Sequence, residues 1–151
     1  LDYALSELMA YKYTIDEADS LTSKFISKKV VLKDKLDAVG LTVLLGAYRP
    51  AGTMIDVYAR FTYPEDVSNM SDWIELDNMT PEVYSNLANT RDYRDFEYVL
   101  PDETNEYSAF QIKFVLRHAT VSELDSPDLS NIDPDINLFP HLYDYRAIAL
   151  T

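Results

Sequence analysis

The sequence contains no cysteine and only three glycines among its 151 residues. Without cysteine the chain has no disulfide, no thiolate nucleophile and no cysteine-ligated zinc site. So few glycines also exclude the phosphate-binding loops and dinucleotide fingerprints, which need several glycines at fixed spacing. The Gly-x-Ser-x-Gly motif of hydrolases is absent as well. Several large enzyme classes are therefore excluded by composition.

Positive charge is scarce too. The chain has 13 lysines and arginines against 26 aspartates and glutamates, a formal net charge of −13. A field of that sign repels phosphate backbones and anionic lipid surfaces, so we expect neither nucleic acid nor a membrane as a partner. No apolar run approaches the roughly 18 residues that a membrane helix needs. No basic and apolar signal pattern opens the chain.

Tyrosine is abundant, with 12 copies in a chain of which 47% is hydrophobic and 26% is charged. This composition is typical of one globular domain, long enough to bury a core without metal or disulfide. Tyrosine favours strands and interfaces, where a ring can be half buried while its hydroxyl stays wet. Because the first residue is Leu1, we expect a piece of a longer chain. Residues 1–22 are interpreted as an N-terminal connector, helical or extended, and residues 23–151 as the domain.

Apolar and polar residues alternate along most of the domain, the pattern of half-buried strands. We predict strands over residues 25–32, 41–47, 55–63, 73–76, 94–100, 109–117 and 143–150. The Arg-Pro-Ala-Gly turn at 49–52 predicts a hairpin between its flanking strands. Thr80 and Pro81 predict one or two helical turns. The expected fold is all-β, an antiparallel β-sandwich or jelly roll with about seven or eight strands.

Three parts of the sequence, taken in order, resemble a known family. They are Lys-Lys-Val-Val-Leu (28–32) with Leu-Asp-Ala (36–38), Ala-Tyr-Arg-Pro-Ala-Gly (47–52) running into residues 55–58, and residues 107–116 followed by Asp-Tyr-Arg-Ala-Ile-Ala-Leu (144–150). Together they resemble a β-rich domain near the ends of virion structural proteins of large contractile-tailed bacteriophages, including cyanophages. The similarity covers residues 25–150. Residues 123–142 depart from it, because this acidic, proline-containing loop is longer than expected.

The resemblance implies a non-enzymatic structural role in the tail, baseplate or fibre-attachment region of a virion. It implies other virion structural proteins as partners, in repeated or symmetric copies, and it brings no catalytic residues and no cofactor. A second hypothesis is a carbohydrate- or receptor-binding sandwich at a fibre or baseplate tip, with a host-surface glycan as ligand. An exposed aromatic cluster on one face would favour this second hypothesis.

Aromatic and acidic residues are the candidate interaction sites. Tyr48, Tyr58 and Trp73 are candidates for stacking on a partner or a sugar ring, and Tyr58 is the best because its strand face is predicted to be wet. The alternative for these rings is ordinary packing. The acidic loop contributes Asp125, Asp128, Asp133 and Asp135. Their carboxylates suit calcium, but the spacing misses the EF-hand pattern, so a solvated loop is expected and no metal is predicted.

Three further features are expected to be structural. His118 and His141 lack additional ligands at metal-binding spacing. The acidic residues around 92–103 contain neighbours that would suit a glycosidase, but an acidic chain produces such pairs by chance, and no enzyme is predicted. Arg146 lies between apolar residues, so we expect it to meet a carboxylate across the sheet.

Overall fold

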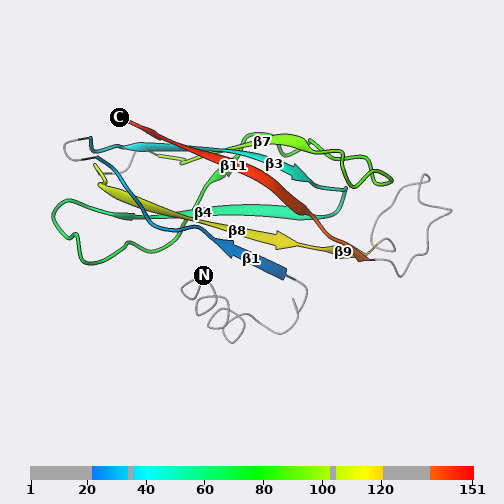
Figure 1. Cartoon of the computed structure of the whole chain (residues 1–151), viewed down its shortest axis with the longest axis horizontal. Coiled ribbons are helices and arrows are strands. Elements are labelled where there is room, and N and C mark those ends of the chain that lie inside the picture. The colour runs from blue at the N-terminus through cyan, green and yellow to red at the C-terminus, as the bar shows by residue number, and fades with distance from the viewer. Residues whose placement is uncertain (1–21, 34–35, 103–104, 121–136) are drawn as a thin grey trace.

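The structure is a computed structural model that describes residues 22–33, 36–102, 105–120 and 137–151. These residues form an all-β molecule in which two antiparallel sheets pack face to face (Figure 1). Within this part of the chain there is no helix. No helical segment that could cross a membrane is therefore found among these residues. The predicted β-sandwich is therefore confirmed.

Each sheet combines strands that lie far apart in the sequence. The first sheet has the order β1 (Thr22–Ile26), β8 (Ala109–Arg117), β4 (Met54–Thr62) and β5 (Ile74–Glu75), and β2 (Val30–Val31) also pairs with β8. The second sheet has the order β11 (His141–Leu150), β3 (Gly40–Tyr48), β7 (Arg94–Val99) and β6 (Asp77–Asn78). A short ribbon joins β9 (Ala119–Thr120) to β10 (Asn137–Leu138).

The predicted strands differ from the observed ones mainly where the ladders are short. Five of the eleven described strands have two residues each, too few for alternation to be seen in a sequence. The strand expected over 25–32 is two strands, β1 and β2. The first strand begins at Thr22, one residue before the predicted domain boundary. Residues 1–21 and residues 123–136 of the acidic loop, including its four aspartates, lie outside the described residues. The rest of the predicted loop, residues 137–142, contains β10 and the beginning of β11.

The core lies between the two sheets. On β4, Ile55, Val57, Ala59 and Phe61 face inward and are buried. The register pairs Val57 with Phe114 of β8, so the apolar faces of both strands point the same way, as their alternation predicts. On the facing sheet, alternate residues of β3 and β7 are buried in the same cluster. Because both sheets bury these faces against each other, the opposite face of each sheet forms the surface of the molecule.

The predicted hairpin around the Arg-Pro-Ala-Gly turn is wrong. β3 pairs with β7 and β11, whereas β4 pairs with β8 and β5. The turn itself is present: Gly52 has φ 85°, and the Thr53 amide donates to the Pro50 carbonyl at 3.2 Å. Such a φ favours glycine. Each strand carries an apolar face, so the link crosses from one sheet to the other and lets both faces enter one core.

The predicted helical turns after Pro81 are absent. The Thr80 hydroxyl accepts a hydrogen bond from the Glu97 amide of β7 at 3.2 Å instead of capping a helix. The Thr80 amide donates to the Asn78 side chain at 2.9 Å. Local side-chain bonds of this kind compete with helix formation. The segment is therefore an irregular connection tied to β7.

Tyr98 links the two sheets through its hydroxyl, and this contact makes stability depend on pH. The Tyr98 hydroxyl donates to the Ile55 carbonyl at 2.7 Å, and burial raises the pKa of Tyr98 to about 12. The raised pKa means that the unfolded chain releases this proton first. The contribution of the protonated Tyr98 hydroxyl to the free energy of unfolding is therefore fully present below pH 10 and is lost as the pH rises towards 12.

Replacing Tyr98 with phenylalanine is expected to reduce the decrease in unfolding free energy at alkaline pH by about 2–3 kcal/mol. At neutral pH the same change should cost about 1 kcal/mol, because the Ile55 carbonyl loses its donor. Urea unfolding between pH 8 and pH 12 measures both effects. Tyr143→Phe, at an exposed ring, is the control. Parallel pH profiles for the wild type and Tyr98→Phe would contradict the argument.

Candidate functional site

Tyr58 and Trp73, both selected from the sequence, lie together on the outer face of the first sheet. Lys113 of β8 is opposite Tyr58 in the β4–β8 register. Its Nζ atom lies 4.7 Å from the Tyr58 ring centroid and 4.5 Å from that of Trp73. The Arg60 guanidinium lies 4.5 Å from the Trp73 centroid. Two rings and two cations therefore form one cluster, which we call the cation–aromatic cluster.

The cation–aromatic cluster is largely filled by its own members. Lys113 is only 8% exposed, and both rings are half buried. Cation–π contacts of this geometry each contribute about 0.5–2 kcal/mol, more when desolvated. A sugar stacking on Tyr58 or Trp73 would have to compete with a cation already placed against the ring. The arrangement therefore favours a packing role for these two aromatics.

The outer face of β8 departs from the predicted alternation. Gln111, Lys113 and Val115 point outward from the core, yet all three are buried. The Gln111 amide donates to the Ser27 carbonyl at 2.8 Å and accepts from Arg60 at 2.8 Å. The buried amide of Gln111 is therefore satisfied within the chain, as buried polar groups usually are.

Tyr48 is not an exposed contact residue, so that prediction is wrong. Its side chain is 3% exposed, and its hydroxyl donates to the Leu87 carbonyl at 3.0 Å. Burial, with a smaller contribution from the charge of Asp92, raises the pKa of Tyr48. The ring also lies 5.6 Å from that of His141. Tyr48 instead anchors the loop formed by residues 85–94.

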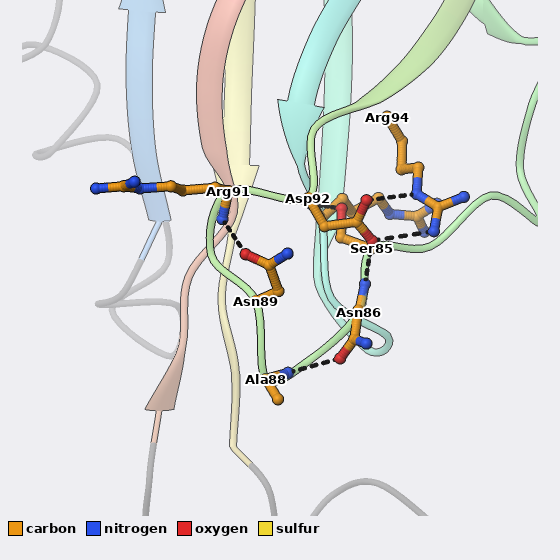
Figure 2. Close-up of polar contacts among 8 residues, drawn as sticks. Ser85, Asn86, Ala88, Asn89, Arg91, Asp92 and Arg94 are labelled. Atoms are coloured by element: carbon orange, nitrogen blue, oxygen red, sulfur yellow. Dashed lines mark hydrogen bonds and ion pairs between the residues drawn. The ribbon is translucent and has the colours of Figure 1, made fainter.

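That loop is held in shape by its own side chains (Figure 2). The Asp92 carboxylate accepts from the Asn86 amide at 2.7 Å and from two Arg94 nitrogens at 3.0 Å each. These bonds, chiefly the one from Arg94, lower the pKa of Asp92. The Asn89 side chain accepts from the Arg91 amide at 3.0 Å. Several local bonds in a short segment give a defined surface, and that surface presents Tyr93.

Tyr93 stacks on Tyr143 of β11, and the sequence did not indicate that these two exposed rings would meet. The ring centroids are 4.4 Å apart and the planes differ by 19°. The two residues remain 42% and 66% exposed. Neither residue belongs to a regular alternating stretch of a strand. Tyr93 precedes β7, and Tyr143 lies at the β-bulge between Leu142 and Asp144. The available signal was tyrosine abundance, which does not identify position.

β11 itself presents exposed apolar side chains on both of its faces at one margin of the sandwich. Tyr145 is 40% exposed, and Ile148 and Leu150 are exposed as well. The Tyr145 ring lies 6.2 Å from that of Phe25 on β1 and 5.0 Å from that of buried Phe114. The core therefore continues to the surface where β1 and β11 face each other. We call these four exposed residues (Phe25, Tyr145, Ile148 and Leu150) the β11 margin.

No group of three or more potential metal ligands occurs in the described part of the chain. Asp95, Glu97 and Asp144 line an open groove of about 530 Å³ on the outer face of the second sheet. The ring of His118 stacks on Phe139 at 5.7 Å. The expected carboxylate partner of Arg146 is wrong: its cross-strand neighbour is Leu44, and Arg146 makes no ion pair within the described residues.

Comparisons with protein-family models, curated proteins and solved structures yielded no significant match for this chain. Function is therefore argued from the geometry of the chain and from the resemblance noted in its sequence. Two open surfaces among the described residues are the Tyr93–Tyr143 pair and the β11 margin. Each of them includes residues of β11.

Proposed function

We propose that this chain is a non-enzymatic structural module of a bacteriophage virion. In this role it docks on neighbouring virion proteins in the tail, baseplate or fibre-attachment region. The observation that carries the proposal is β11, a ten-residue strand at the edge of its sheet. Edge strands offer unpaired backbone groups to other chains, and the exposed side chains of the β11 margin add apolar area to such a contact.

Charge and the resemblance support the same proposal. A formal charge of −13 argues for protein partners over nucleic acid or membranes. The segments that resemble tail proteins include most of β8 and most of β11, so the resemblance extends over most of the strand with the open edge. No cofactor or metal enters this role.

The proposal is tested on purified virions of the phage that encodes the chain. Quantitative mass spectrometry of gradient-purified particles should detect the chain at a fixed copy number per virion. Immunogold labelling should place it on the tail and not on the capsid. Detection in the infected-cell lysate but not in purified particles would overturn the virion role. Treating the particles with salt before analysis removes adsorbed proteins and serves as the control.

The Tyr93–Tyr143 pair favours a second candidate function, binding of a host-surface glycan. Exposed tyrosines suit stacking on sugar rings, and Asp92 and Arg94 lie next to Tyr93 with hydrogen-bonding groups. Glycan-array binding of the full chain, compared with Tyr143→Ala, tests this candidate. Binding that disappears with Tyr143→Ala would favour receptor recognition. Absence of binding leaves docking as the function of this surface.

A further inference from the structure

The free edge of β11 exposes backbone groups at every second residue. In an antiparallel strand the N–H and C=O of one residue point to the same side, and the side alternates along the strand. The Leu150 carbonyl accepts from the Val39 amide at 2.9 Å, next to the first residue of β3. Even-numbered residues from Asp144 onward therefore bond β3. Tyr145, Ala147 and Ala149 direct their backbone groups away from it, where no described strand pairs with β11.

Within the described residues, this edge has little of the usual protection against pairing with another strand. Natural edge strands are commonly shielded by lysine, by proline, by short length or by a covering segment. The ten residues of β11 contain neither lysine nor proline. The bulge lies near its beginning, between Leu142 and Asp144, which leaves residues 144–150 regular. The β11 margin beside this edge is apolar and exposed.

We propose that the occupant of this edge is a second copy of the same chain, with the two β11 strands antiparallel across a two-fold axis at Tyr145. Such an interface uses one surface patch twice, as two-fold interfaces do. The axis places Asp144 opposite Arg146 of the partner subunit, and Arg146 opposite Asp144 of the partner subunit. This inference rests on the proposed docking function and names its partner.

The charge pattern of β11 selects this register over its neighbours. An axis one residue later would set Arg146 against Arg146 of the partner subunit, and like charges directly opposite are destabilising. An axis at Ala147 would set Arg146 against Ile148 of the partner subunit and leave both charges unmatched. With the axis at Tyr145, residues 144 and 146 form a closely spaced, non-hydrogen-bonded pair, where opposite charges interact best.

Apolar burial favours the same arrangement. Tyr145 faces the core side of its sheet and contacts Phe114 and Phe25. An axis at this residue brings Tyr145 against Tyr145 of the partner subunit and covers both Phe25 rings. The two cores then continue into each other across the joined sheets. Removing exposed apolar area from water supplies the driving force, and the charges supply the register.

Charge exchange tests the register with the full-length chain. Asp144→Arg places arginine opposite arginine, and Arg146→Asp places aspartate opposite aspartate. Each single variant should raise the dimer dissociation constant by about tenfold or more, because two contacts change from attraction to repulsion. An equimolar mixture of the two variants should form a heterodimer, since each arginine then meets an aspartate. Sedimentation velocity measures all species, and thermal unfolding confirms that each variant is folded.

A backbone variant tests the edge independently of charge. Ala147→Pro removes an amide that points to the free edge and leaves the β3 ladder intact, a position where proline is tolerated. It should be folded and monomeric. Thr42→Ser, on the outer side of β3 opposite Ile148, is a control that should dimerise as the wild type does.

The outcomes separate this inference from the proposed function. If the wild type is monomeric at about 100 µM, its dimer dissociation constant lies above that concentration, which is too weak for a useful interface. That result would overturn self-pairing and leave the virion role to its own test. A wild-type dimer that persists in Asp144→Arg and Ala147→Pro would also overturn it, because the interface would lie elsewhere. A dimer lost in each single variant and regained in the mixture supports the proposed register. Absence from virions would defeat the proposed function without affecting that result.

Discussion

Replacing Phe114 with alanine is expected to lower the free energy of unfolding by about 3–5 kcal/mol, the largest effect of any single change considered. Phe114 is fully buried on β8. It is opposite Val57 of β4 and Phe25 of β1, and its ring lies 5.0 Å from that of Tyr145 on the facing sheet. Truncation removes apolar contacts to three strands at once and leaves a cavity that antiparallel ladders on both sides cannot easily close.

The effect is measured by urea unfolding at neutral pH, followed by circular dichroism. Phe25→Ala is the matched control, because Phe25 contacts the same ring at 6.1 Å but is 45% exposed. We expect it to cost less than half as much, in proportion to the smaller area it buries. Self-pairing of β11 would bury Phe25 and could make the two losses of unfolding free energy equal. Both variants are therefore made in the Ala147→Pro background, which is expected to be monomeric. Equal losses in that background would mean that Phe25 is buried in the monomer as well.

Arg49→Met is expected to destabilise the chain by about 2–4 kcal/mol. Arg49 is a buried arginine at the crossing between the sheets. Its side chain donates to the carbonyls of Thr53 at 3.0 Å, Pro81 at 3.2 Å and Val83 at 3.2 Å. Its guanidinium also lies 4.8 Å from the Tyr84 ring centroid. Methionine fills similar volume but leaves three carbonyls without this donor.

Thermal and urea unfolding check the Arg49 prediction, with Arg91→Met as the control. Arg91 is exposed, and its side chain points away from the bonded part of its loop (Figure 2). An exposed substitution of this kind should change stability by no more than about 0.5 kcal/mol. If Arg49→Met is equally mild, the three carbonyl contacts contribute little. The crossing would then be held by strand packing alone.

Strand periodicity could be predicted wherever one face of a strand is apolar. The alternation along β4 and β7 depends on side chains two residues apart, so it is visible without the fold. The pairing of strands is different. Whether β4 pairs with β3 or with β8 depends on which arrangement buries both apolar faces, and a five-residue link permits either. The hairpin prediction failed for this reason.

The candidate site shows the same division. Tyr58 was correctly placed on the outward face of its strand, because its neighbours alternate. That Lys113 of β8 would lie against both Tyr58 and Trp73, the residue before β5, could not be predicted, since the sequence leaves the pairing of these strands open. Tyr48 was misjudged because its burial comes from the loop around Leu87, which is distant in sequence.

By itself the sequence determined the all-β class, the faces of the long strands, the acidic charge and the absence of cysteine chemistry. These follow from composition and from the two-residue period of a strand, which are local properties. Only the tertiary structure decided that β11 lies at the edge of the described sheet and that Asp144 and Arg146 flank a residue whose backbone groups point away from β3. An edge is defined by the strand that is absent beside it, and that is a property of the whole sheet.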